Sequence, residues 1–232
     1  MLGGEKCLCC SRATLAVPLC KNCIPLLTDS HTTETCSVCG RVLVSEIGRC
    51  SLCRDSPVLS SVDRAFSLHS YHLWKKSLLF AWKFEDKRNL SAYFAAVVLQ
   101  KLRAIESEEG MRIPVVPVPP RPGKIKNRGW DQIDELCFYL EKGWNVRVLR
   151  LLERLSRSQQ KKLDRVQRLD AMGSSYRLRK RRVISRLLPQ LPPAVLILDD
   201  VLTTGATVES CACQLKTLGI QKIFSLTLFI VD

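Results

Sequence analysis

The sequence predicts an α/β protein with a mostly parallel sheet, preceded by a small cysteine-rich domain. Nine of the 12 cysteines lie before residue 54, whereas short β-branched runs alternate with helical periodicity after residue 57. Such alternation is typical of a sheet with parallel strands. The stretch "SPVLSS" suits a linker, so we expect one domain over 1–57 and a second over 58–232.

The elements of the larger domain follow from apolar spacing and from residues that start or stop helices. We expect helices after Tyr71 and Asn89, a helix begun by Asp131, and a helix over 206–218 that Gly219 ends. Strands are expected over 112–118, 145–152, 195–200 and 222–231. The intervening segment 156–172 is basic, polar and only weakly periodic.

Four Cys-x-x-Cys pairs near the N-terminus predict two zinc sites. Each pair supplies two thiolates from one tight bend, and zinc takes four ligands. No secretion signal is visible, which favours metal ligation over disulfides. Four thiolates leave no open position, so the zinc should be structural. Cross-braced pairing and a redox role for one pair stay open. Sequential pairing gives one set of Cys7, Cys10, Cys20 and Cys23 and another of Cys36, Cys39, Cys50 and Cys53.

The charge of the chain is concentrated in one block. The formal net charge is +14, and residues 147–186 hold 14 Lys/Arg against three Asp/Glu. Such a block indicates an anionic partner, such as phosphate, pyrophosphate or nucleic acid, although a solvated basic face is the alternative. No apolar run approaches the ~20 residues that a membrane span needs. We therefore expect a soluble, cytoplasmic protein.

The stretch "VLILDDVLTTGATVES" has the pattern of an anion-binding loop. An apolar strand ends in Asp199 and Asp200, and a loop of small residues then leads into a helix. The N–H groups at a helix N-terminus bind phosphate, and threonine hydroxyls and a glycine help the loop approach it. The two carboxylates suit vicinal sugar hydroxyls. Together these features fit a ribose 5-phosphate, and the loop lacks the frame of a Walker motif.

The same stretch resembles the phosphoribosyl pyrophosphate signature of type I phosphoribosyltransferases. The resemblance implies that the larger domain has the mostly parallel sheet of the type I phosphoribosyltransferases. It also implies that Asp199 and Asp200 bind the ribose hydroxyls. The 5′-phosphate would then be bound by Thr203, Thr204, Gly205, Ala206 and Thr207.

Two further stretches resemble the ComF-type competence proteins, which also begin with a double zinc ribbon. These are "VVPVPPRPGKIKNRGWDQ" and "SRSQQKKLDRVQRL" followed by "SSYRLRK". The chain departs from the family pattern at Trp130, Asp131 and Ala171. Trp130 suits packing as well as contact with an acceptor. The resemblance implies a link to DNA uptake, with single-stranded DNA or a DNA-uptake helicase as partners.

Phosphoribosyl transfer needs cations on the leaving pyrophosphate and a lid against water. Mg²⁺ would bridge the substrate hydroxyls and the pyrophosphate. We expect Arg121, Lys124 and Arg128 to contact the pyrophosphate, and segment 157–168 to close as a lid that contributes Arg157, Gln160, Lys161 and Arg165. The acceptor base is not encoded in a motif. The alternative is a non-catalytic module that binds a phosphoribosyl ligand or single-stranded DNA while its zinc ribbons dock a partner.

Overall fold

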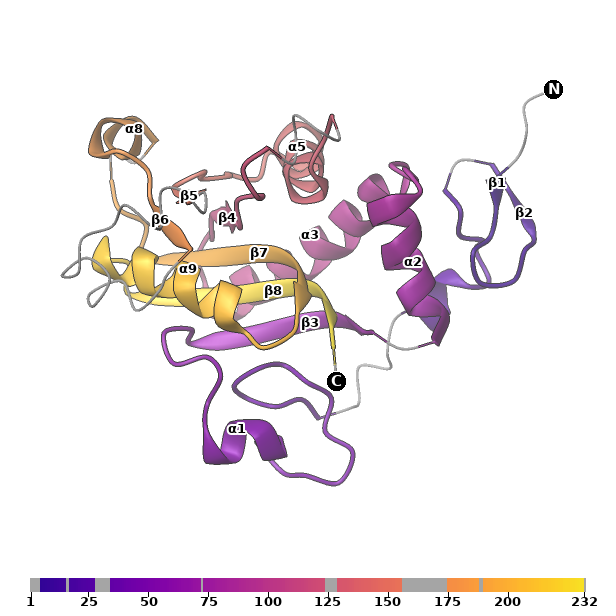
Figure 1. Ribbon diagram of the computed structural model, residues 1–232, viewed down its shortest axis with the longest axis horizontal. Helices are drawn as coiled ribbons and strands as arrows, with labels where there is room; N and C mark the ends of the chain where they lie inside the picture. Colours follow the sequence, from indigo (N-terminus) through magenta and orange to yellow (C-terminus); the bar gives the residue numbers. More distant parts are fainter. Residues whose placement is uncertain are drawn as a thin grey trace.

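A four-stranded parallel sheet forms the centre of the molecule, as the sequence predicted (Figure 1). The computed structural model describes residues 5–15, 17–27, 34–71, 73–123, 129–155, 175–187 and 190–231. The strand order is β3-β8-β7-β4, and each neighbouring pair is parallel. The strands are β3 (Arg64–Ser70), β4 (Val115–Pro117), β7 (Ala194–Leu202) and β8 (Lys222–Ile230).

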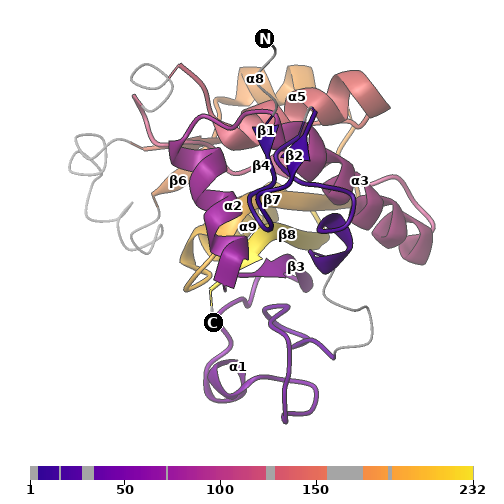
Figure 2. The same ribbon diagram turned by 90° about the vertical axis from the view of Figure 1, so that its right-hand side faces the viewer.

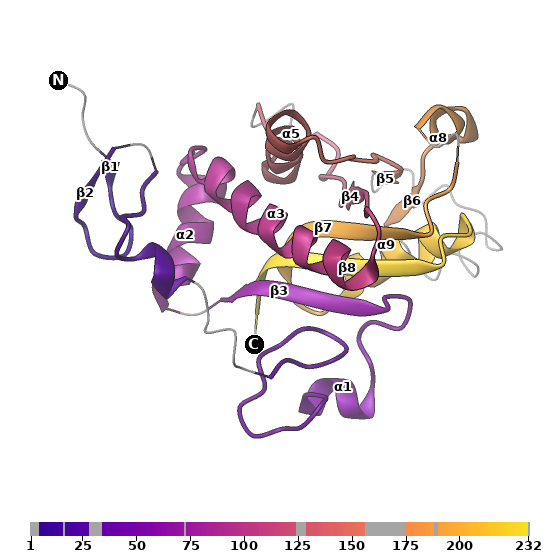
Figure 3. The same cartoon turned by 180° about the vertical axis from the view of Figure 1, so that it is seen from behind.

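Helices cover both faces of this sheet (Figures 1 and 3). Side chains of a strand alternate between its two faces, and β7 shows this directly. Leu196 and Leu198 belong to the apolar cluster that includes helices on one side. Val195 and Ile197 belong to the cluster on the other side. The first side carries α2 (Leu73–Phe84), α3 (Leu90–Glu109) and α5 (Gln132–Trp144), and the second carries α9 (Ala206–Thr217).

Helix α5 starts and helix α9 ends at the residues that the sequence predicted. Asp131 caps α5, because its Oδ1 accepts hydrogen bonds from the N–H groups of Ile133 at 3.0 Å and Asp134 at 3.1 Å. An aspartate in this role satisfies backbone donors that the helix leaves unpaired. Gly219 follows α9 with φ of +95°, a conformation in which glycine is favoured.

Two expectations about strands need correction. Segment 145–152 is not a full strand, because one parallel bridge at Val148 joins it to Val115. Asn145 takes a left-handed conformation at the end of α5, which delays the extended chain. The sequence analysis also missed β3, whose Ser67 and His69 interrupt an apolar pattern. These polar side chains are accommodated because Ser67 Oγ lies 2.9 Å from Thr227 Oγ1 and His69 Nδ1 lies 2.9 Å from the Leu27 carbonyl.

A short antiparallel hairpin lies beside the sheet and carries the basic part of the chain. It pairs β5 (Leu152–Arg154) with β6 (Tyr176–Leu178), and α8 (Arg181–Leu187) follows. Segment 156–174, which includes the whole of the proposed lid (157–168), lies outside the described residues. Among the helices that the structure describes, none is long and apolar enough to cross a membrane.

The two cysteine clusters lie at different places on the body (Figures 1 and 2). The first has two cysteines between the small strands β1 (Glu5–Lys6) and β2 (Ala13–Thr14) and two after β2, near α2. The second includes α1 (Ser51–Asp55), near β3. The short helix η1 (Ile24–Leu26) follows the first cluster. The structure thus has an N-terminal region with two tetra-cysteine clusters ahead of a parallel α/β sheet. The boundary at residue 57 stays a prediction.

Candidate functional site

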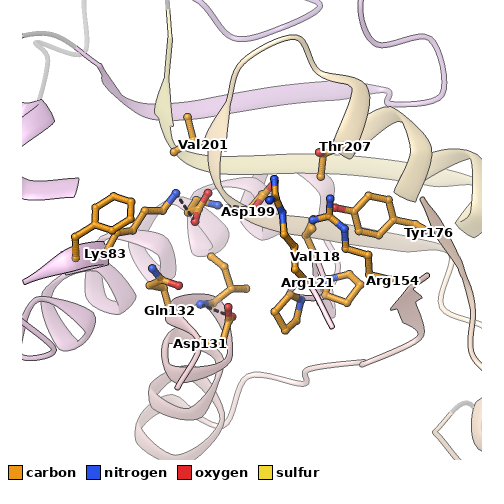
Figure 4. Close-up of a pocket in the computed structure, with 15 residues that line it drawn as sticks. Lys83, Val118, Arg121, Asp131, Gln132, Arg154, Tyr176, Asp199, Val201 and Thr207 are labelled. Carbon is orange, nitrogen blue, oxygen red and sulfur yellow. Dashed lines mark hydrogen bonds and ion pairs between the residues drawn. The ribbon is translucent and has the colours of Figure 1, made fainter. Parts of the chain in front are cut away.

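A pocket of about 450 Å³ lies at the carboxyl ends of β4 and β7 (Figure 4). Ligands of open α/β sheets bind at this edge, because the loops that follow the strands converge there. Its polar lining residues come from seven separate segments of the chain. They are Lys83, Arg121, Asp131, Gln132, Arg154, Tyr176, Asp199, Asp200 and Thr207.

The two acids at the end of β7, which were expected to bind sugar hydroxyls, line this pocket. Burial and, after it, the nearby charge of Asp200 together raise the pKa of Asp199 to about 8. Asp199 Oδ1 accepts a hydrogen bond of 2.8 Å from the N–H of Asp200. A carboxyl group whose charge is this costly is unusual outside functional sites. The pair can accept hydrogen bonds from a ligand's hydroxyls.

Lys83 is a site residue that the sequence analysis missed. It lies in the last turn of α2, and its Nζ forms an ion pair of 2.7 Å with Asp200 Oδ2. Both side chains are about one-fifth exposed, at 20% and 19%, so a ligand can reach the pair. A lysine inside the otherwise apolar run "LLFAWKF" was the available signal. Its neighbour Phe84 also lines the pocket and is 68% exposed.

Residues 203–207 comprise the turn after β7 and the first two residues of α9, and we name them the phosphate loop. Gly205 occupies the N-cap position with φ of +76°, a backbone conformation that other residues rarely adopt. Thr204 Oγ1 accepts a hydrogen bond of 3.5 Å from the N–H of Ala206. Thr203 and Thr204 are exposed, and Thr207 lines the pocket. The loop therefore presents hydroxyls and a helix N-terminus at one place, which suits an anion.

The hairpin β5–β6 adds two residues that the sequence analysis did not select. The Arg154 guanidinium lies over the Tyr176 ring, 5.1 Å from its centroid. Burial raises the pKa of Tyr176, against the smaller effects of Arg154 and of a hydrogen bond with Thr207. The two residues flank the basic segment 156–174 in sequence, but only the folded hairpin shows that they reach the pocket.

The residues predicted to contact pyrophosphate divide into two groups. Arg121 lines the pocket directly after β4, so the structure brings it together with the acids. The others lie outside the described residues: Lys124, Arg128, Arg157, Gln160, Lys161 and Arg165.

Trp130 and Asp131 have local structural roles. Trp130 is buried, and the Arg88 guanidinium lies over its ring at 5.1 Å. Trp130 is not among the pocket's lining residues, so it acts in packing. Asp131 lines the pocket while capping α5, and asparagine, the residue usual in the family pattern, caps helices equally well.

The two cysteine sets have the geometry of metal centres. The sulfur atoms of each set lie within 4.8 Å of one another, and the sets follow the sequential pairing. The distances are 3.6 Å between the Cys10 and Cys20 sulfurs and 3.8 Å between those of Cys39 and Cys50. A tetrahedron with zinc–sulfur bonds of ~2.3 Å has edges of about 3.8 Å. The residues present therefore fit zinc, and both sites are closed by protein ligands.

The thiols of these sets are prepared for ionisation to different degrees. Burial raises the pKa of Cys7, but the backbone N–H groups of Cys20, Cys10 and Cys9 outweigh this effect and lower it to about 6. Similar N–H groups lower the pKa of Cys36 to about 7 against the effect of burial. Zinc binds thiolates, so N–H donors around sulfur favour its binding. Of the other cysteines, Cys137 and Cys211 are buried within the body.

No protein-family model matches this chain, and no curated protein matches it either.

Proposed function

We propose that this chain is a ComF-type, phosphoribosyltransferase-like protein that binds phosphoribosyl pyrophosphate with Mg²⁺ and transfers its phosphoribosyl group to a base. The observation that carries the proposal is the placement of an acid pair and a phosphate loop on one strand–turn–helix unit. Asp199 and Asp200 end β7, and residues 203–207 open α9 beside the same pocket.

In this proposal the two ends of the ligand bind different residues. The 5′-phosphate accepts hydrogen bonds from the phosphate loop, while Asp199 and Asp200 accept them from the ribose hydroxyls. Arg121 and Arg154 line the pocket and offer positive charge to the pyrophosphate. Lys83, which pairs with Asp200 in the structure, is a third cation within reach of the ligand. Mg²⁺, when bound with the substrate, supplies further charge on the leaving oxygens.

The chemistry asks for positioning rather than covalent catalysis. The bond between C1′ and the pyrophosphate oxygen breaks, and the electron pair leaves with the pyrophosphate. A ring nitrogen of the acceptor then forms the new bond at C1′. The protein's residues hold the ribose and stabilise the charge that develops on the leaving group. The exposed ring of Phe84 is an apolar wall against which a planar acceptor could lie.

The proposal is tested by replacing the acid pair. Asp199→Asn with Asp200→Asn should abolish binding of phosphoribosyl pyrophosphate and Mg²⁺ in isothermal titration, since both hydroxyl-binding carboxylates are lost. Asp134→Asn is the matched control, because Asp134 pairs with Arg150 and does not line the pocket. A double variant that binds as tightly as the wild type rules out this site.

A non-catalytic module is the second candidate, and the charge of α8 and its flank favours it. The cations of this surface are exposed, and Arg177 forms an ion pair of 2.8 Å with Glu153. The set is Arg177, Arg179, Lys180, Arg181, Arg182 and Arg186. Such a surface suits single-stranded DNA. The second cluster also exposes Val44 and Ile47, which suits a docking partner such as a DNA-uptake helicase. Oligonucleotide binding that weakens steeply with salt would support this candidate.

A further inference from the structure

The second cysteine cluster is connected to the phosphate loop by a short segment, residues 56–61, which we name the connector. It follows the cluster's last ligand, Cys53, and precedes β3. The backbone N–H of Val58 acts on the Cys53 thiol, where it partly offsets the rise in pKa that burial causes. Leu59 is 3% exposed and belongs to the apolar cluster that contains all four cysteines of this set. The connector is therefore part of the second metal centre's packing.

The connector packs directly against the phosphate loop. A Cβ atom built on Gly205 would lie 3.2 Å from Leu59 Cδ2 and 3.3 Å from the Val58 carbonyl oxygen. Both distances are shorter than usual van der Waals contact. Gly205 thus lies directly against the Leu59 side chain and the Val58 carbonyl, with no room for a side chain of its own. A shift of the connector would move Gly205, the residue that turns the chain into α9.

Glu209 attaches the connector to the first turn of α9. Its carboxylate accepts hydrogen bonds from the backbone N–H groups of Ser60 at 2.9 Å and Ser61 at 3.0 Å. The hydroxyls of both serines donate to the same carboxylate. These bonds lower the pKa of Glu209 although burial opposes the shift. The helix whose N-terminus would bind phosphate is therefore held in place by the connector.

The other side of the second cluster is fixed to the sheet. Gly40 has φ of +74°, and a Cβ built on it would lie 2.8 Å from the Ala65 carbonyl oxygen in β3. Arg41 Nη2 donates a hydrogen bond of 3.0 Å to the carbonyl of Val231, which follows β8. With one side fixed to the sheet and the other to the connector, the folded cluster sets the distance between them.

The first cluster has no comparable route to the loop in the described part of the chain. Leu8, Val17 and Leu19 near it pack with the apolar cluster on the α2 side of the sheet. Glu5 pairs with Lys87, just after α2, at 2.8 Å. Two sites with the same four-cysteine chemistry thus have different neighbours, which makes the first cluster a control for the second.

We propose that the second cysteine cluster is a positioning device for the phosphate loop, so that loss of its metal disorders the loop and weakens phosphoribosyl ligand binding. This inference rests on the proposed function for the identity of the ligand, but not for the order of the loop. Metal in the first cluster does not have this effect. Leu59 and Glu209 are positioning residues, because Leu59 packs against the loop, Glu209 holds the connector to α9, and neither lines the pocket.

Matched cysteine substitutions test the proposal. Cys50→Ser and Cys20→Ser each remove one buried ligand, at 2% and 7% exposure, from the second and first cluster. Metal analysis should show that each variant keeps about one zinc per chain. Hydrogen exchange of segment 203–217, measured without ligand, should accelerate in Cys50→Ser and stay at the wild-type rate in Cys20→Ser. Equal exchange of this segment in both variants would overturn the proposal.

Variants that keep both zincs guard against general unfolding. Leu59→Ala and Glu209→Gln should retain two zincs but bind phosphoribosyl pyrophosphate with Mg²⁺ about tenfold more weakly, since the loop must be ordered at the expense of binding. Binding at wild-type affinity in both variants contradicts the positioning role. If the wild type itself does not bind this ligand, the proposed function fails, and the exchange rates still decide the inference.

Discussion

The two tetra-cysteine clusters have the same ligand chemistry but different surroundings. All four cysteines of the second set are buried, whereas Cys10 of the first set is exposed. The second set shares an apolar cluster with the sheet and α9, and three cysteines of the first set form a small cluster with Cys9 alone beside them. Two clusters with the same cysteine motif therefore need not contribute equally to the stability of the fold. The surroundings decide how much of the protein depends on each metal.

The largest expected effect concerns the release of zinc. A chelator or thiol reagent should release about two zincs per chain in two phases, because exposed ligands exchange faster than buried ones. The fast phase should belong to the first cluster and be missing in Cys10→Ser. The midpoint of thermal unfolding should fall mainly during the slow phase, when the second cluster loses its zinc.

This prediction is checked by following metal release with a colorimetric chelator and unfolding by circular dichroism on the same samples. Cys9→Ser is the control, because Cys9 belongs to neither set and should leave both phases unchanged. A single phase, or a chain that folds with less than one zinc, contradicts the account of two separate centres.

The second prediction concerns the acid pair and pH. The folded pKa of Asp199 is about 8, above its ordinary value near 3.8. Between these values the folded state holds a proton that the unfolded state has released, so stability falls as pH rises. Asp199→Asn cannot ionise. The variant and the wild type should differ least in free energy of unfolding near pH 4. Above that pH the variant should become more stable than the wild type, by on the order of 1 kcal/mol per pH unit up to about pH 8. Urea unfolding at several pH values measures it, and an advantage independent of pH would count against the buried charge.

The third and smallest effect separates backbone strain from contact at two glycines. Gly205 and Gly110 both have positive φ, at +76° and +65°. Only Gly205 has close neighbours, because a Cβ on Gly110 would meet nothing within 4 Å. Gly110→Ala should cost about 1 kcal/mol of stability from strain alone. Gly205→Ala should cost about 1 kcal/mol more, because the connector must also shift. Equal losses in thermal unfolding would show that the connector does not restrain the loop.

The parts of the fold that could be predicted from the sequence are those encoded within short segments. The cysteine sets follow from Cys-x-x-Cys spacing, and the β7–α9 unit follows from an apolar run, two acids and a glycine turn. The cap at Asp131 is equally local. In each case the residues that determine the structure lie close together in the sequence.

The parts that could not be predicted depend on contacts between distant segments. Strand β3 has a mixed pattern because His69 and Ser67 find partners in other segments, at Leu27 and Thr227. Lys83 reads as an ordinary helix residue until the fold places it 2.7 Å from Asp200. The different packing of the two clusters has the same origin, since their spacing patterns are alike and only tertiary contacts distinguish them.

The most direct test of the central claim is the titration of the wild-type, zinc-loaded chain with phosphoribosyl pyrophosphate and Mg²⁺ at low and high salt, beside a short single-stranded oligonucleotide. The account predicts saturable binding of phosphoribosyl pyrophosphate at one site per chain, retained at high salt because the pocket encloses the ligand's hydroxyls and phosphate. Oligonucleotide binding, if present, should weaken steeply with salt. No binding of phosphoribosyl pyrophosphate at either salt concentration, while the oligonucleotide binds, would contradict the account.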